Sequence, residues 1–257
     1  MTQNSKNAII TGARSGIGLA TLKLFAASGT NCWAVVHSSD PDWEECIDEL
    51  RQRHNVWIKP VFIELENHDS IRSGIMEIRR DKKPVDILVN SAGYTSPDSL
   101  FTMTKMEQIR KVMEINFFSV IQIIQSVVRI MMGQKSGSII NISSIAAWSE
   151  DTSQMEYVAS KSALIAATKR LAGEFGTYNI RINAIAPGLT ETKMLNGLKK
   201  EHADTIRKGI AMKRFALAEE VARLCAFLAS DASHYITGET IRIDGGGFNL
   251  RTFLSKN

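Results

Sequence analysis

The stretch "NAIITGARSGIG" (7–18) leads from a short apolar run into a glycine-rich turn and then into a helix. Gly12, Gly16 and Gly18 are spaced by four and two residues. Glycines here allow a tight turn, let backbone amides approach a pyrophosphate, and let the helix pack close to a sheet. Because the spacing differs from G-x-G-x-x-G, the turn alone indicates either a dinucleotide-binding site or a purely structural turn.

Short β-branched runs alternate with longer helical patterns along the rest of the chain. The expected strands are 7–10, 31–36, 56–65, 85–93, 136–144, 180–188 and 238–246, and the expected helices are 16–28, 40–54, 70–82, 105–132, 157–175 and 218–230. This alternation predicts βαβ units and a parallel sheet. No linker-like stretch interrupts it. We therefore expect an α/β protein with a single doubly wound Rossmann domain over 1–257, about seven parallel strands, and helices on both faces.

Composition narrows the classes of partner. The chain has 257 residues, of which 31 are basic and 27 acidic, and the net charge is +4. The charges are scattered, so we expect no nucleic-acid partner and only a mild bias toward anionic small molecules. The most apolar stretch, 115–132, contains Asn116, Gln122, Gln125 and Arg129, which would be costly in lipid. We interpret it as a buried or subunit-contacting helix and expect no membrane association.

Cysteine and histidine spacing argues against disulfides and metal. Cys32, Cys46 and Cys225 are odd in number and far apart, and there is no CxxC pattern. The five histidines show no ligand pairing, so we expect no metal. The start "MTQNSKNAII" lacks the regions of a signal peptide. These features predict a cytoplasmic protein.

A second group of residues converges on one edge of the predicted sheet. In "YVASK", Tyr157 and Lys161 are four positions apart and share a helix face. Such a pair in isolation usually reflects packing and solvation. Here, however, Ser144 ends a strand 13 residues earlier, Asn116 is placed at the start of the preceding long helix, and "NSAG" (90–93) ends the fourth strand. Open α/β sheets bind ligands at this carboxyl edge.

With these motifs in this order, the chain resembles the short-chain dehydrogenase/reductase family over nearly its whole length. The stretches that carry the resemblance are "TGARSGIG" (11–18), "NSAG" (90–93), Asn116, "NISS" (141–144), "YVASK" (157–161), "IRINAIAPG" (180–188) with "TET" (190–192), and "ITGETIRIDGG" (236–246). Within the family, it is most similar to the group that includes 3-oxoacyl-carrier-protein reductases and many sugar, polyol and steroid dehydrogenases.

The resemblance implies an oxidoreductase that transfers a hydride between a nicotinamide dinucleotide and a small carbonyl or secondary alcohol, with Tyr157 as general acid/base. A free phenol has a pKa of roughly 10, so the Lys161 cation is expected to lower it. Ser144 would hydrogen-bond the carbonyl oxygen, and Ser143 is its nearer rival. Asn116 would anchor a water that links Lys161 to solvent, although it could instead be a helix-start residue.

The resemblance also assigns dinucleotide contacts. They are Gly12, Arg14, Ser15, Gly16, Ile17, Gly18, His37, Ser38, Glu64, Leu65, Asn90, Ala92, Gly93, Tyr157, Lys161, Pro187, Gly188, Leu189 and Thr192. Lys161 would hold the nicotinamide ribose, Thr192 a phosphate, and Asn90 the adenosine ribose, unless Asn90 only stabilises a turn. Glu64 replaces the usual aspartate near the adenine.

The end of the second expected strand bears on the choice of cofactor. A carboxylate there binds the ribose diol and repels a 2′-phosphate, but here His37 and Ser38 occupy the place and Asp40 comes slightly too late. Arg14, His37 and Ser38 could receive a 2′-phosphate, so NADP(H) is favoured and NAD(H) is possible. Against this, Ser15 stands where NADP users often carry a basic residue.

The substrate is less determined. Tyr94, Ser144, Trp148 and Met155 are candidates for its pocket, and the long connection 189–218 is expected to be a substrate loop or lid. A 3-oxoacyl-carrier-protein reductase is one alternative: Lys135 fits an acidic carrier, whereas Tyr178 replaces a basic residue. A non-catalytic dinucleotide-sensing protein is another. The resemblance also implies a homotetramer that pairs helices 105–132 and 157–175.

Overall fold

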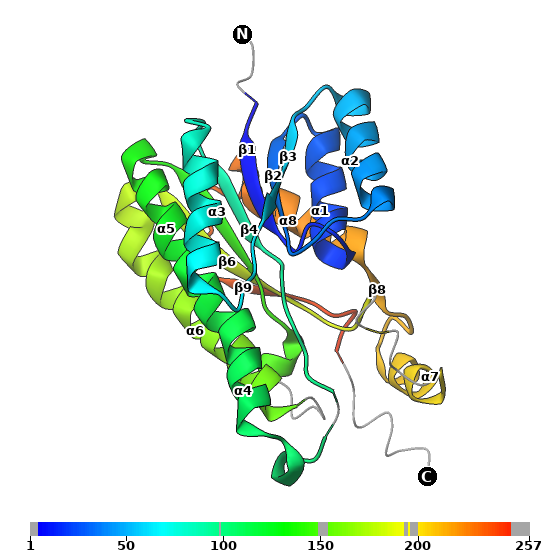
Figure 1. The fold of residues 1–257 in the computed structure, drawn as a ribbon. Helices are drawn as coiled ribbons and strands as arrows, with labels where there is room; N and C mark the ends of the chain where they lie inside the picture. The colour runs from blue at the N-terminus through cyan, green and yellow to red at the C-terminus, as the bar shows by residue number, and fades with distance from the viewer. Residues whose placement is uncertain (1–4, 98, 149–153, 193–194, 196–199, 248–257) are drawn as a thin grey trace.

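The computed structural model describes residues 5–97, 99–148, 154–192, 195 and 200–247. Its centre is a parallel seven-stranded sheet in the order β3-β2-β1-β4-β5-β6-β9 (Figure 1). The strands are β1 Asn7–Thr11, β2 Asn31–Val36, β3 Ile58–Phe62, β4 Ile87–Asn90, β5 Gly137–Ile142, β6 Ile180–Pro187 and β9 Thr240–Ile243. The predicted doubly wound α/β class is confirmed.

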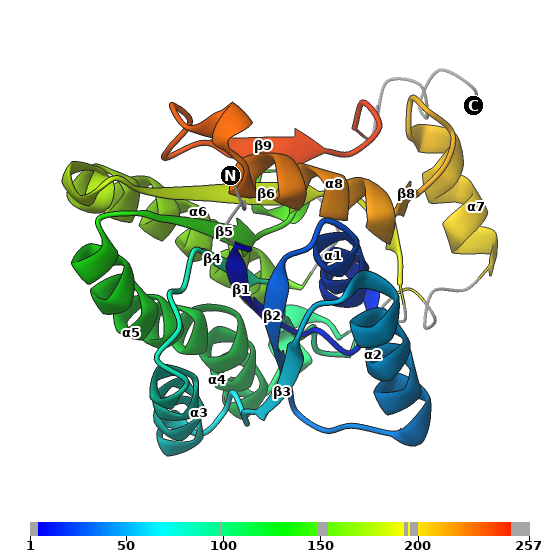
Figure 2. The same ribbon diagram turned by 90° about the horizontal axis from the view of Figure 1, so that it is seen from above.

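Helices cover both faces of the sheet (Figure 2). One face carries α1 Gly16–Ala27, α2 Pro41–His54 and α8 Ala218–Ala229, and the other carries α3 His68–Arg80, α4 Met106–Met113, α5 Ser119–Gln134 and α6 Met155–Phe175. Two apolar cores result, one on each side of the strands. Short 3₁₀ turns lie at Phe101–Met103 (η1), Ile145–Ala147 (η3), Gly176–Tyr178 (η4) and Asp231–Ser233 (η6).

Local chemistry explains where the first helices begin and end. Asp40 caps α2 as its position before Pro41 predicts, because its Oδ1 accepts a hydrogen bond of 2.9 Å from the Trp43 amide. Gly29 follows α1 with a φ of +78°, a left-handed conformation that suits glycine. Each of these capping signals involves residues that are close together in the sequence, so the sequence alone indicates where the two helices begin or end.

The strand order reverses direction between β1 and β4, which creates the topological switch point where such sheets bind ligands. Thr11 at the end of β1 lies opposite Asn90 at the end of β4. The Thr11 hydroxyl accepts hydrogen bonds of 3.1 Å from the amides of Ser91 and Ala92. The glycine-rich turn and the "NSAG" turn are therefore joined side by side at this edge.

The helix expected over 105–132 is interrupted. A π-helical turn, η2 Glu114–Phe118, separates α4 from α5. Among the described residues, only the run Met106–Gln134 is long and apolar enough to cross a membrane, a test that core helices of globular proteins also pass. In this run Ile123, Val127 and Met131 are fully buried in the core beneath the sheet. The run therefore behaves as a core helix.

The connection 189–218 is more regular than expected. The strand β7 Thr190–Glu191 pairs in parallel with β8 Ala216–Leu217, and the helix α7 Lys200–Gly209 lies between them. This pairing joins the two ends of the connection, and the Ala216 amide also donates to the Leu189 carbonyl at 3.0 Å. Positions 193–194 and 196–199 lie outside the described residues.

Candidate active site

Tyr157 and Lys161 lie one turn apart at the start of α6. Lys161 is only 4% exposed, and its Nζ donates a hydrogen bond of 2.9 Å to the Ile142 carbonyl at the end of β5. The same Nζ lies 5.8 Å from the centre of the Tyr157 ring. The helix therefore brings the phenol and the ammonium together at the carboxyl edge of the sheet.

The two adjacent serines after β5 have different partners. The buried Ser143 hydroxyl donates to the backbone carbonyl of Lys161 at 3.0 Å. The Ser144 side chain is hydrogen-bonded to the Tyr157 phenol, and its Oγ accepts from the Ala146 amide at 3.2 Å. The structure thus places Ser144 at the phenol, while the hydroxyl of Ser143 fixes the backbone of α6.

Burial shifts the pKa values of both Tyr157 and Lys161. Burial raises the pKa of Tyr157 above its ordinary value, and the hydrogen bond from Ser144 opposes that rise only in part. Burial also lowers the pKa of Lys161 to about 8. In the chain by itself, burial dominates the pKa of the phenol, and its expected lowering by Lys161 together with an oxidised nicotinamide stays a prediction.

The alternative that Asn116 begins a helix is wrong, because Asn116 lies within the π-helical turn η2 and is fully buried. Its Oδ1 accepts from the Tyr94 amide at 2.8 Å, and its Nδ2 donates to the Tyr94 carbonyl at 2.8 Å and to Ser160 Oγ at 3.1 Å. A Cβ on Gly93 would lie 3.4 Å from Lys161 Nζ and 3.6 Å from Asn116 Oδ1. Asn116 therefore ties the segment after "NSAG" to the catalytic helix.

In the glycine-rich turn, neighbouring backbone segments come too close together for side chains at Gly12 and Gly18. Gly12 has a φ of +69°, and a Cβ there would meet the Ala92 backbone at 2.9 Å. A Cβ on Gly18 would lie 2.2 Å from the Gly12 carbonyl oxygen, which no side chain could tolerate. The first turn of α1 is consequently pressed against the end of β1, and the Ser15 side chain does not cap the amides at its start, where a helix N-terminus favours an anion.

The segment after β6 reaches this turn. Gly188 donates its amide to the Ile243 carbonyl at 2.9 Å, and a Cβ there would meet the Asp244 backbone at 3.0 Å. A Cβ on Gly16 would be 3.1 Å from the Thr192 methyl group. Pro187, Gly188, Leu189 and Thr192 thus follow a path from the end of β6 to the glycine-rich turn, as contacts to one extended ligand would require.

Asn90 carries an unpaired acceptor. The side chain is 1% exposed, and its Nδ2 donates to Asn141 Oδ1 at 2.9 Å, which in turn is linked to Thr168. No described residue hydrogen-bonds the buried Oδ1 of Asn90. Buried polar atoms without a partner are rare in proteins, so this oxygen is available to a hydroxyl of a bound ligand.

The end of β2 carries a cluster of charged side chains. Arg14 Nη1 donates to Ser38 Oγ at 2.7 Å, and His37 Nε2 lies 2.6 Å from Glu64 Oε2. Asp40, which is expected to come slightly too late in the chain to bind the ribose diol, contacts Arg14: its Oδ2 accepts from both Nη2 and Nε, the latter at 3.1 Å.

Several predicted residues lie at the margin of the site. The side chains of Ile17 and Leu65 are partly buried and pack against the core. Trp148, directly after η3, is 48% exposed, and Met155, at the start of α6, is 43% exposed. Tyr94 lies under Lys111, whose Nζ is 5.4 Å from the ring centre.

The residues present fit a dinucleotide. The amides at the start of α1, which the Ser15 side chain does not cap, suit a pyrophosphate, the free acceptor of Asn90 suits a ribose hydroxyl, and Gly93 leaves space beside Lys161. Among the described residues, no three His, Cys, Asp or Glu side chains gather as a metal site would require.

Sequence reasoning missed several supporting residues. Thr11 joins the two ligand-facing turns, Ser160 links Asn116 to α6, and Ser96 donates to the buried Glu156. Each is a small polar residue in or near a motif, and each makes its contact with a residue distant in sequence. The hydrophobic periodicity of the sequence, which predicts helices and strands, does not predict such contacts.

This arrangement, a phenol paired with a serine hydroxyl and a buried amine beside a dinucleotide-type turn at the switch point, is that of a nicotinamide-dependent oxidoreductase. A family model described as enoyl-(acyl carrier protein) reductase matches residues 12–247. The chain belongs to the short-chain dehydrogenase/reductase family, and the expected enzyme class, an oxidoreductase of small carbonyl and alcohol substrates, is confirmed.

Three similar proteins cover nearly the whole chain. The 3-oxoacyl-[acyl-carrier-protein] reductase FabG of Thermotoga maritima is 37% identical over 96% of this chain and 99% of its own length. FabG of Chlamydia trachomatis is 33% identical over 94% and 97%, respectively. The acetoacetyl-CoA reductase of an Acinetobacter species is 34% identical over 94% and 97%.

Proposed function

We propose that the enzyme uses NADP(H) in preference to NAD(H) and reduces the ketone of a small carbonyl substrate, with 3-oxoacyl thioesters as the first candidates. The contact between Ser144 and Tyr157 carries this proposal. Because the pKa of the phenol is raised, Tyr157 keeps its proton at neutral pH, which suits a group that must donate a proton to a carbonyl oxygen. Similar proteins named for 3-oxoacyl and acetoacetyl substrates support the thioester.

The roles of the side chains follow from their positions. Ser144 donates a hydrogen bond to the substrate oxygen and holds it at the phenol, and Tyr157 delivers the proton to that oxygen. When bound, the nicotinamide supplies the hydride. Lys161 stabilises negative charge that develops on Tyr157 and holds the ribose hydroxyls, while Asn116 fixes the Tyr94 backbone and orders a water beside Lys161.

A direct test compares wild type with Tyr157→Phe. We expect acetoacetyl-CoA reduction with NADPH in the wild type and a loss of about 10³-fold or more in kcat for the variant, since general acid catalysis contributes roughly 10²–10⁴. NADPH affinity should remain within about threefold, because the phenyl ring and α6 are retained. Equal rates for both proteins would overturn the mechanism. Activity with other ketones but not with thioesters would overturn the substrate alone.

The cofactor preference rests on Arg14 and Ser38. Neither position holds a carboxylate, and the guanidinium and hydroxyl are already 2.7 Å apart, as two groups that receive one phosphate would be. We expect wild type to bind NADPH more tightly than NADH, and Arg14→Gln to weaken NADPH about tenfold with little effect on NADH. Tighter binding of NADH by the wild type would overturn this preference.

The proposal also covers the binding partner of the enzyme and its location in the cell. Lys135 is exposed at the end of α5, and Tyr178 is 38% exposed, so one basic group is in place for an acidic acyl carrier. All three thiols are free, which favours a reducing compartment, and we place the enzyme in the cytoplasm without membrane attachment. We also infer that the whole chain, 1–257, acts as one domain.

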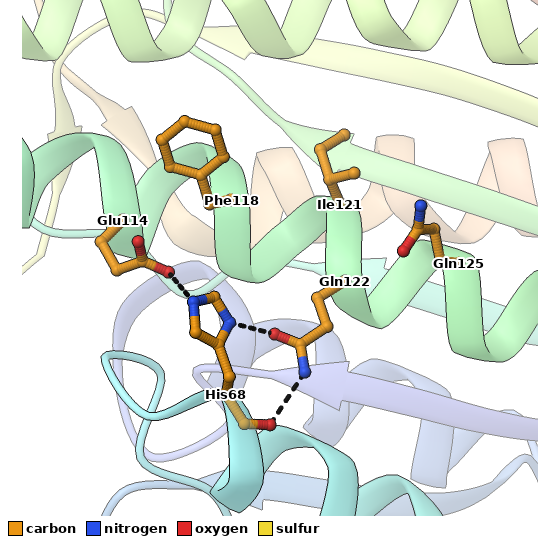
Figure 3. A pocket seen from close by; sticks show the side chains of 6 residues that line it. All are labelled: His68, Glu114, Phe118, Ile121, Gln122 and Gln125. Carbon is orange, nitrogen blue, oxygen red and sulfur yellow. Dashed lines mark hydrogen bonds and ion pairs between the residues drawn. The ribbon is translucent and has the colours of Figure 1, made fainter.

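A homotetramer is the proposed assembly, and the outer face of α4 and α5 supports it. Phe118 is 49% exposed beside a shallow pocket of about 500 Å³ (Figure 3). The pocket is lined by His68, Glu114, Phe118, Ile121, Gln122 and Gln125. Glu114 Oε1 is buried 3.6 Å from His68 Nε2 and has no hydrogen-bond partner among the described residues. The exposed aromatic ring beside this pocket suits a subunit contact.

Light scattering tests the assembly. We expect a tetramer for wild type and a smaller species for Phe118→Lys, because the introduced ammonium would be buried at the contact. Phe62→Lys is the matched control: Phe62 is 55% exposed on the edge strand β3, away from this face, and its replacement should leave the tetramer intact. A wild-type monomer would contradict the proposal.

A further inference from the structure

The charged residues at the end of β2 form two ion pairs. Arg14 is paired with Asp40 through Nε and Nη2, and His37 Nε2 lies 2.6 Å from Glu64 Oε2. Each basic side chain that would receive a 2′-phosphate is thus already in contact with a carboxylate. The cluster contains as many potential negative charges as positive ones, which is unusual for a site selective for an additional phosphate.

A second hydrogen bond restrains Asp40 in this position. Its Oδ1 caps α2 by accepting from the Trp43 amide at 2.9 Å, so only Oδ2 faces Arg14. The Trp43 indole in turn donates to the Ala13 carbonyl at 3.2 Å, which fixes the start of α2 against the glycine-rich turn. Rotation of the Asp40 carboxylate away from Arg14 would therefore weaken the helix cap.

We propose that Asp40 limits the preference for NADP(H) by partly neutralising Arg14, so that the enzyme accepts both nicotinamide dinucleotides. This inference rests on the proposed 2′-phosphate site at Arg14 and Ser38. A phosphate bound to these groups meets the guanidinium, but it also lies near a fixed carboxylate of like charge, which offsets part of the attraction. NAD(H) has no such phosphate and is not affected by this repulsion.

Asp40→Asn isolates the charge, because asparagine caps a helix as well as aspartate does. Titration of the purified enzyme with NADPH and with NADH should show NADPH affinity raised about fivefold to tenfold and NADH affinity changed less than about twofold. The control is Asp42→Asn, which removes the same charge from an exposed position in the same helical turn. It should leave the ratio of the two affinities unchanged.

The outcomes separate this inference from the proposed function. An unchanged or lower ratio of NADPH to NADH affinity in Asp40→Asn, with an unchanged melting temperature, would overturn the inference. The Arg14→Gln variant tests the site beneath it: if that change does not weaken NADPH, the proposed phosphate site itself is wrong. A weaker NADPH affinity in Arg14→Gln without a gain in Asp40→Asn would defeat the role of Asp40 alone.

Discussion

The two halves of the ligand edge are built differently. The proposed catalytic half, around Tyr157 and Lys161, is fixed by buried hydrogen bonds between α6, β5 and the π-helical turn. The adenine half, around Arg14 and Asp40, consists of half-exposed ion pairs, with about 39% of both side chains accessible. Buried bonds hold one geometry, whereas exposed pairs contribute little to stability and can be exchanged. Changes in the first half should therefore alter rate and stability, and changes in the second that keep the Asp40 helix cap should alter mainly cofactor choice.

The largest effect expected from this contrast distinguishes two neighbouring serines. Ser144→Ala removes the hydroxyl at the phenol, and kcat should fall by about 10²-fold to 10³-fold, as for other single oxyanion donors. Ser143→Ala removes the bond to the Lys161 carbonyl instead, so it should lower the free energy of unfolding by about 1–2 kcal/mol with a much smaller loss of kcat. Steady-state kinetics and urea unfolding of both variants check this. A larger kinetic loss in Ser143→Ala would reverse the assignment of the two hydroxyls.

A second prediction concerns the stability cost of the buried amine. Because burial lowers the pKa of Lys161 to about 8, the unfolded chain binds this proton more tightly than the folded chain. Between about pH 8 and the ordinary lysine value of about 10, the free energy of unfolding should therefore rise with pH. At neutral pH the ammonium destabilises the fold by roughly 3 kcal/mol. Lys161→Met should thus be inactive but more stable, by about 1–2 kcal/mol once the lost bond to Ile142 is counted.

Urea unfolding at pH 7 and pH 9.5 measures this directly. The difference in stability between Lys161→Met and wild type should shrink as the pH rises, because wild type loses the buried charge. Lys169→Met, an exposed position two turns along α6, is the control and should change stability by less than about 0.5 kcal/mol. A variant at Lys161 that is less stable than wild type at pH 7 would show that the buried amine holds the catalytic half together rather than straining it.

The same contrast explains what the sequence could reveal. The strand 31–36 is observed as expected, because β-branched runs and turn residues are local signals. The π-helical turn at Asn116 was not foreseen, since it depends on hydrogen bonds to the backbone of Tyr94, which is distant in sequence. The paired two-residue strands β7 and β8 are too short to show periodicity.

The charged side chains at the end of β2 show most clearly what the sequence could not predict. The motifs predicted that Arg14, His37 and Ser38 lie together at the cofactor site. The position of Asp40, by contrast, was judged only from its distance along the chain after the second strand. Its actual position is set by the packing of Trp43 of α2 against the glycine-rich turn. Motif spacing therefore predicted which side chains meet around Tyr157 and Lys161, because these partners are inside recognisable stretches, but not the contacts of Arg14, because its partners are brought together by tertiary packing.

The smallest effect is expected at Glu64, the second carboxylate of the adenine half. Glu64→Gln keeps an acceptor for His37 but removes a half-exposed negative charge, so NADPH affinity should rise by only about twofold to threefold. Glu66→Gln is a close control, because Glu66 lies two residues along and pairs with Lys111 at 2.7 Å. Neither change should alter kcat at saturating cofactor. Should Glu64→Gln lower kcat or the melting temperature markedly, the adenine half would be structurally coupled to the catalytic half, and the division between a fixed and an exchangeable region would not hold.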